Sequence, residues 1–182
     1  MTADARRHAL PPDAIEIERK FLVSAPPPDL DRHPSSAIRQ GYLAIEPNGT
    51  EARVRDCDGA AVLTVKQGGG RTRVEVEVPI DAGAFERLWP LTDGRRIEKT
   101  RHLVPAGDGL VIELDVYGGA LEGLVVAEVE FPTEAAADAF DPPPWLGADV
   151  TADERYKNQR LALDGAPDGA LTATRAAPAR PR

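Results

Sequence analysis

The sequence predicts an α+β fold built mainly of antiparallel β-strands. Three observations support this fold class. Apolar and charged residues alternate with period two in about eight short segments. Glycine, proline, asparagine and aspartate gather between most of these segments, as they do in turns. Roughly two or three other stretches have the spacing and capping residues of short helices.

The first expected strand has one charged and one apolar face. Glu16, Glu18 and Lys20 lie on the charged face. The opposite face is apolar except for Arg19, and its other members are Ile15, Ile17, Phe21 and Val23. The rise along a strand places the two carboxylates about 6–7 Å apart. Like charges at this distance repel, so either water screens them, or a divalent metal and Lys20 neutralise them.

Three strands are expected in the next part of the chain, separated by glycine-containing turns. They span Arg39–Ile45, Ala52–Arg55 and Val62–Lys66. The glycines at 68–70 predict a further turn. They lack the strand, loop and helix context of a phosphate-binding loop, so they are not read as a nucleotide site.

Four more strands and the helices complete the expected fold. The strands span Arg71–Val78, Ile97–Leu103, Leu110–Tyr117 and Leu124–Phe131. Asp81 is the expected N-cap of a short helix that Pro90 ends, and Thr133 caps a helix to about Phe140. Thr151-Ala152-Asp153-Glu154 has the capping-box pattern, which predicts a helix from about Ala152 to Leu163.

Composition favours one soluble domain. Residues 14–164 are expected to form it, between a disordered lead at 1–13 and a disordered tail at 165–182. No apolar run is long enough to span a membrane, and no secretory signal is expected, so a cytoplasmic location is the default. The single cysteine, Cys57, fits a reducing compartment. A net charge of −8 argues against a general nucleic-acid binder.

The charged faces of the strands contain paired like charges. The acids are Glu16, Glu18, Glu75, Glu77, Glu113, Asp115, Glu128 and Glu130, and the bases are Lys20, Arg53, Arg55, Lys66, Arg71, Arg73, Lys99 and Arg101. A sheet with one wet face could have this pattern, although a solvated face usually mixes polar residues and avoids adjacent like charges. Alternatively, the sheet closes into a barrel with the charges inside. Acids would then bind hard divalent cations, and bases would bind phosphate oxygens.

At these positions the sequence resembles the CYTH superfamily, also called triphosphate tunnel metalloenzymes. The signature ExExK matches Glu16-x-Glu18-x-Lys20, and Arg155-Tyr156-Lys157-Asn158 resembles the family's C-terminal helix signature. The intervening matches, in the family's order, are Arg53-x-Arg55, Leu63-Thr64-x-Lys66, Arg73-x-Glu75-x-Glu77, Lys99-x-Arg101, Glu113-x-Asp115 and Glu128-x-Glu130. The resemblance runs from about Ile15 to Leu163.

The resemblance implies an eight-stranded antiparallel β-barrel that forms a tunnel, with a few flanking helices. Members act on triphosphate groups with Mg²⁺ or Mn²⁺. The chain is most similar to the short bacterial tripolyphosphatases, through stretches at 16–22, 39–43, 94–101 and 142–145. The implied activity is metal-dependent hydrolysis of tripolyphosphate to diphosphate and phosphate, with two metal ions.

The resemblance also assigns roles to individual residues. Glu18, Glu128 and Glu130 would hold the metal that bridges the phosphates, and Glu16 would help position a second metal and the attacking water. Glu75, Glu77, Glu113 and Asp115 would complete the acidic shell or pair with the bases. The expected phosphate-binding residues are Lys20, Arg53, Arg55, Lys66, Arg73, Lys99 and Arg101, with Arg155 and Lys157 as further candidates. Catalytic candidates are Glu16, Lys99 and Tyr42, the last of which could equally be a packed aromatic.

Three other functions would use the same residues. An adenylyl cyclase of the same fold would cyclise ATP, and a thiamine or nucleoside triphosphatase would hydrolyse a larger substrate. A sensor would bind triphosphate without turnover. The expected partner is a small triphosphate compound, with no nucleic acid and no membrane, and the chain is expected to be a monomer or a homodimer.

Overall fold

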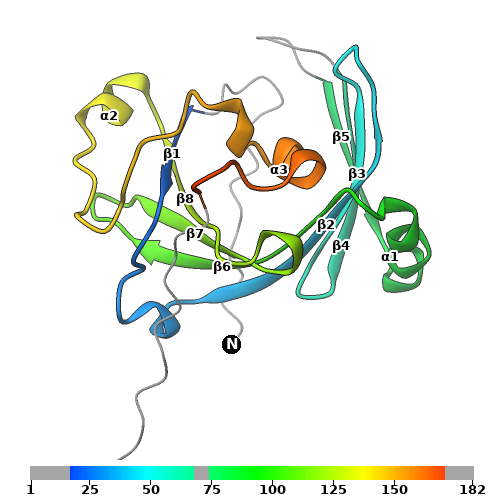
Figure 1. The fold of residues 1–182 in the computed structure, drawn as a ribbon, viewed down its shortest axis with the longest axis horizontal. Helices are drawn as coiled ribbons and strands as arrows, with labels where there is room; N and C mark the ends of the chain where they lie inside the picture. Colours follow the sequence, from blue (N-terminus) through cyan, green and yellow to red (C-terminus); the bar gives the residue numbers. More distant parts are fainter. Residues whose placement is uncertain (1–16, 68–73, 171–182) are drawn as a thin grey trace, which may run out of the picture.

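The computed structural model describes residues 17–67 and 74–170 (Figure 1). The expected lead at 1–13, the glycine turn at 68–70, and Ile15, Glu16, Arg71 and Arg73 lie outside the described residues, as does 171–182 of the expected tail. Residues 165–170 are described, and Ala166 and Ala170 pack against buried residues. Within the described part of the chain, no helix is both long and apolar enough to cross a membrane.

An eight-stranded antiparallel sheet forms the body of the molecule, as the sequence predicts. Its strands are β1 (Ile17–Leu22), β2 (Ser35–Ile45), β3 (Glu51–Cys57), β4 (Ala60–Gln67), β5 (Val74–Ile80), β6 (Arg96–Pro105), β7 (Val111–Tyr117) and β8 (Val125–Phe131). The order across the sheet is β1-β8-β7-β6-β2-β3-β4-β5. The sheet curls into two arms that are joined through β2 and β6 (Figure 1).

The predicted barrel-like antiparallel fold is confirmed, although the sheet is not closed among the described residues. β1 and β5 are its two edges and do not pair with each other. The reason lies at the edge of β1, where a later segment already bonds to it. Gly147 and Val150 donate to the carbonyls of Leu22 and Lys20 at 2.8 Å, and Leu22 donates to Ala148 at 2.9 Å. A segment in this place satisfies the edge that closure would otherwise use.

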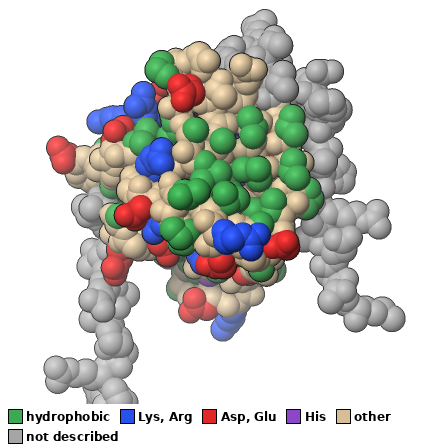
Figure 2. Space-filling model, turned by 90° about the vertical axis from the view of Figure 1, so that its right-hand side faces the viewer, with side chains coloured by type: hydrophobic (Ala, Val, Ile, Leu, Met, Phe, Trp, Pro, Cys, Tyr) green, Lys and Arg blue, Asp and Glu red, His purple; other side chains and the backbone are tan. Residues whose placement is uncertain are grey.

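The two faces of the sheet differ as the alternation predicts. The outer face is largely apolar, except that Arg39 of β2 and Arg96 and Glu98 of β6 lie on it. Part of its apolar surface is exposed, and Figure 2 shows hydrophobic side chains gathered on the side of the molecule that is at the right in Figure 1.

Two helices cover other parts of the outer face. Helix α2 (Glu134–Ala139) lies over β1 and β8, and α1 (Ala82–Leu88) lies over β3 and β4. The inner face carries the charged residues, and α3 (Asn158–Asp164) lies between the arms and contacts β6 and β2 (Figure 1).

Two of the three predicted helix starts are confirmed. The Asp81 carboxylate accepts a hydrogen bond from the Ala84 amide at 2.7 Å, and the Thr133 hydroxyl accepts one from the Ala136 amide at 3.1 Å. The third prediction, a helix from about Ala152, is wrong. A short 3-10 turn, η4 (Glu154–Tyr156), is followed by extended backbone at Lys157, and α3 begins only at Asn158. Thr151 does not cap a helix, because its hydroxyl accepts from the Lys20 amide at 2.9 Å.

Arg19 is a charged residue on the apolar outer face. Its guanidinium donates to the carbonyls of Ala137 and Phe140, at 3.1 and 3.2 Å, where α2 ends. It also bonds to Asp149 at 2.8 Å, and it lies 5.0 Å from the centroid of the Phe21 ring. One side chain therefore joins β1 to α2 and to the segment at its own edge.

Candidate functional site

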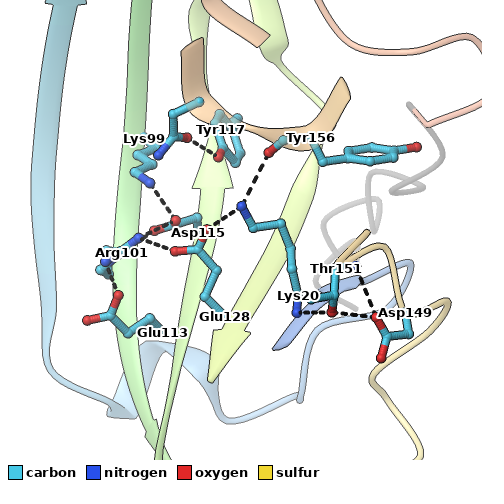
Figure 3. A network of polar contacts seen from close by, with 11 residues as sticks. Lys20, Lys99, Arg101, Glu113, Asp115, Tyr117, Glu128, Asp149, Thr151 and Tyr156 are labelled. Carbon is cyan, nitrogen blue, oxygen red and sulfur yellow. Dashed lines mark hydrogen bonds and ion pairs between the residues drawn. The ribbon is translucent and has the colours of Figure 1, made fainter. Parts of the chain in front are cut away.

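The inner face brings the predicted charged residues of four neighbouring strands into one network. Lys20 comes from β1, Lys99 and Arg101 from β6, Glu113 and Asp115 from β7, and Glu128 from β8 (Figure 3). Strand register explains this, because Lys20 lies directly opposite Glu128, and Arg101 directly opposite Asp115. Residues paired across a sheet project from the same face, so alternation along each strand assembles the cluster.

Asp115 is the centre of this network. Its side chain is completely buried, and it contacts Lys99 Nζ at 2.5 Å and Arg101 Nη2 at 2.6 Å. Arg101 also pairs with Glu113 and, at 3.2 Å, with Glu128. Although burial lowers the pKa of Arg101, the bonds to Asp115 and the nearby carboxylates raise it well above its usual value. Asp115 therefore holds two cations in fixed positions.

Lys20 and Glu128 form a second buried pair. Lys20 Nζ lies 2.8 Å from a carboxylate oxygen of Glu128, and it also donates to the Tyr156 carbonyl at 3.4 Å. Burial on its own raises the pKa of Glu128, but Lys20, Lys99 and Arg101 outweigh burial and lower that pKa to about 2. Glu128 is therefore ionised at any pH near neutral.

The other arm carries a second group of bases. Arg53 lies on β3 directly opposite Thr64, and Lys66 pairs with Glu75 at 2.9 Å. The Arg53 guanidinium is 3.6 Å from Glu51 and 3.9 Å from Glu75, which are long ion pairs. Its Nε is buried, and among the described residues it has no hydrogen-bond partner. An unpaired buried donor is energetically costly, so Arg53 Nε is well suited to donate a hydrogen bond to a bound anion.

The two described catalytic candidates, Tyr42 and Lys99, are both buried. The Tyr42 hydroxyl accepts a hydrogen bond from Gln40 Nε2 at 3.0 Å. Burial raises the pKa of Tyr42 to about 12, so the phenol keeps its proton at neutral pH. Lys99 Nζ lies 5.4 Å from the centroid of the Tyr117 ring, and burial lowers the pKa of Lys99 although Asp115 opposes that effect.

Other predicted site residues lie on the same inner face. Glu18 and Glu130 sit opposite each other on β1 and β8, and both are exposed. On the other arm, Arg55 shares the inner face of β3 with Arg53, and Glu77 accepts a hydrogen bond from the Thr64 hydroxyl at 3.2 Å. Glu16 and Arg73 lie outside the described residues.

Arg155 and Lys157 are not brought into the site. Their side chains are 69% and 60% exposed, and they pair with their neighbours Asp153 and Glu154. Their role in phosphate binding stays a prediction.

The inner face also contains polar residues that the sequence analysis did not select. Gln40 and Thr64 are buried beside Tyr42 and Arg53, and the Tyr117 hydroxyl donates to Asn158 Oδ1 at 2.9 Å. Tyr117 shares the parity of Glu113 and Asp115 on β7, and Gln40 shares the parity of the candidate Tyr42 on β2, and this signal could have identified them.

Comparison with known proteins places the chain in a family. No protein-family model matches it. The inorganic triphosphatase of Nitrosomonas europaea is 51% identical over 148 residues, which cover 81% of this chain and 97% of that protein. The chain belongs to the inorganic triphosphatase family. A second relative, the inorganic triphosphatase of Acetivibrio thermocellus, is 40% identical over 152 residues, covering 80% of this chain and 92% of that protein.

A solved structure of an inorganic triphosphatase agrees with this fold. The crystal structure of the inorganic triphosphatase NE1496 matches with a TM-score of 0.71 and 45% identity, and the match covers 85% of this chain and 98% of that one. The predicted resemblance to triphosphate tunnel enzymes is confirmed.

Proposed function

We propose that the chain hydrolyses inorganic triphosphate to diphosphate and phosphate on the inner face of the sheet. The observation that supports this most strongly is the buried network of paired charges there, in a member of the inorganic triphosphatase family. A triphosphate carries about four to five negative charges, and cationic groups are the partners that it requires.

The bases of both arms bind the phosphate chain in this proposal. Lys20, Lys99 and Arg101 supply one side, and Arg53, Arg55 and Lys66 supply the other, together with Arg73 outside the described residues. Arg53 supports this role because its buried Nε has a hydrogen bond to offer. The ammonium and guanidinium groups are held by carboxylates before substrate arrives, so little reorganisation is needed when charge develops on the phosphate.

The acids of β1 and β8 suit a hard divalent cation. Glu18 and Glu130 are directly opposite each other in register, which places two carboxylates side by side on the inner face. Carboxylate oxygens are the ligands that Mg²⁺ prefers. Within residues 17–67 and 74–170, no three acidic, histidine or cysteine side chains converge to hold a metal. From the family resemblance, we propose that Glu16 joins Glu18, Glu128 and Glu130 in holding one or two ions of Mg²⁺ or Mn²⁺. A bound divalent ion would neutralise phosphate charge and make a water molecule more acidic.

The chain's own residues then serve an in-line displacement. A water molecule attacks the terminal phosphorus, the new P–O bond forms, and the phosphoanhydride bond breaks to leave diphosphate. Lys99 and Arg101 stabilise the charge that develops on the phosphate oxygens. Tyr42 keeps its proton, so its hydroxyl donates a hydrogen bond to a phosphate oxygen. Glu75, Glu77, Glu113 and Asp115 serve as the surrounding acidic shell, in which Glu75, Glu113 and Asp115 pair with bases.

A substrate comparison tests this function. Phosphate release from tripolyphosphate, ATP and thiamine triphosphate is measured in parallel with Mg²⁺ or Mn²⁺, with cyclic AMP assayed in the ATP sample. We expect the fastest release from tripolyphosphate and none in EDTA. Cyclic AMP without phosphate release would instead identify a cyclase, and tight triphosphate binding without turnover would identify a sensor.

A further inference from the structure

Gly41 precedes Tyr42 on β2 and faces the outer side of the sheet, where it is in close contact with Thr92. Thr92 ends the 3-10 turn η2 (Trp89–Thr92) and is completely buried. A Cβ added to Gly41 would lie 2.5 Å from the Thr92 Cβ and 2.8 Å from its Cγ2. Contacts this short do not occur, so the Thr92 side chain occupies the space that a side chain at position 41 would need.

The Thr92 side chain is held in place by its own hydrogen bonds. Its hydroxyl donates to the Trp89 carbonyl at 2.7 Å and accepts from Arg96 Nε at 3.0 Å. Arg96 also donates to the Trp89 carbonyl at 2.7 Å, and its guanidinium lies 4.5 Å from the centroid of the Trp89 ring. These bonds fix one rotamer of Thr92 against Gly41.

The backbone continues this connection to Tyr42. The Thr92 carbonyl accepts from the Arg95 amide at 2.9 Å, and the Arg95 carbonyl accepts from the Tyr42 amide at 3.0 Å. The pairing of β2 with β3 shifts register between Tyr42 and Ala44, so regular pairing is interrupted just after Tyr42. Thr92 therefore restrains Tyr42 twice, through the side-chain contact with Gly41 and through the carbonyl of Arg95.

We propose that Thr92 is a positioning residue for Tyr42 in the triphosphatase reaction, which rests on the function proposed above. Gln40 holds the Tyr42 hydroxyl from the inner face, and Thr92 holds its backbone from the outer face. A reacting group displaced by about 1 Å can lose on the order of 10²-fold in rate, so this support matters for turnover rather than for binding.

A double-mutant cycle tests the proposal. Thr92→Val keeps the shape and removes the hydroxyl, and Thr92→Ser keeps the hydroxyl. We expect Thr92→Val to lower kcat roughly tenfold with KM nearly unchanged, and Thr92→Ser to recover most of the loss. In a Tyr42→Phe background, Thr92→Val should cost little more, because the two residues act as one unit. Arg96→Met, which removes the bond to the Thr92 hydroxyl at a half-buried site, should act in the same direction and is the second variant.

Thr133→Val is the matched control. It also removes a threonine hydroxyl that accepts a backbone hydrogen bond, at the N-cap of α2, and α2 packs on β1 and β8. It should leave kcat unchanged while lowering the melting temperature, because the N-cap is lost. If Thr92→Val lowers kcat as much in the Tyr42→Phe background as in wild type, or lowers it no more than Thr133→Val, the positioning role is refuted.

A readout independent of turnover separates this role from the proposed function. The chain has three tyrosines, so ¹³Cζ-tyrosine labelling gives three resonances, and Tyr42→Phe identifies one of them. Thr92→Val should shift the Tyr42 resonance, and Thr133→Val should not. An unshifted Tyr42 resonance overturns the positioning role. Wild-type protein that fails to hydrolyse tripolyphosphate, with the Tyr42 resonance shifted in Thr92→Val, refutes the function and leaves the structural coupling in place.

Discussion

Asp115→Asn is expected to lower the free energy of unfolding by roughly 3–5 kcal/mol. The wild-type carboxylate is completely buried between Lys99 and Arg101, which are themselves almost fully enclosed. Asparagine preserves the shape of the side chain but leaves two neighbouring cations without their central counter-charge. The loss is measured by urea unfolding in EDTA, without substrate, so that no ligand contributes to stability.

Glu113→Gln is the matched control for Asp115. Glu113 also pairs with Arg101, but its side chain is 31% exposed. Solvent screens such a pair, so the variant should lose about 1 kcal/mol or less. Equal losses in the two variants would show that Asp115 is not the centre of the network.

Lys99→Met is expected to lower kcat by roughly 10²–10³-fold. The Lys99 ammonium lies 2.5 Å from Asp115, within the group of bases proposed to bind phosphate. Asp115 therefore holds the ammonium in position before the reaction begins. Methionine fits the space beside the Tyr117 ring, and Asp115 keeps Arg101 as its partner. The free energy of unfolding should therefore fall less than in Asp115→Asn. Initial rates of phosphate release from tripolyphosphate give kcat and KM.

Arg87→Met controls for the loss of one positive charge. Arg87 lies in the last turn of α1 on the outer face, and the variant should keep the wild-type rate. A Lys99→Met variant that raises KM with kcat intact would contradict the catalytic role and leave Lys99 as a phosphate-binding residue only.

The sheet and the residues of its inner face could be predicted because both follow from the alternation of apolar and charged residues along the strands. Successive side chains of a strand point to opposite faces, so the charged residues at every second position project from the same face of the sheet. Lys20 and Glu128, 108 residues apart, meet because they share this parity and are directly opposite in register. The parity of the strands was readable from the sequence, but the pairing of β1 with β8 was not predicted and is seen in the structure.

Features that depend on contacts between distant segments could not be predicted. Thr151 has the local pattern of a helix N-cap, yet its hydroxyl bonds to the Lys20 amide because the segment around it docks on the edge of β1. The same docking leaves the barrel open among the described residues. Arg19 is a charged residue on an otherwise apolar face of β1. Its role could not be predicted, because it depends on bonds to the end of α2 and to Asp149, which are distant in the sequence.

The most direct test of the central claim compares Glu18→Gln with Glu134→Gln in phosphate release from tripolyphosphate with Mg²⁺. Both residues are exposed glutamates, one on the inner face and one at the start of α2 on the outer face. Glu18→Gln should lose roughly 10²-fold or more in rate while remaining folded, and Glu134→Gln should keep the wild-type rate. A Glu18→Gln variant as active as the wild type would contradict the assignment of the inner face as the site of hydrolysis.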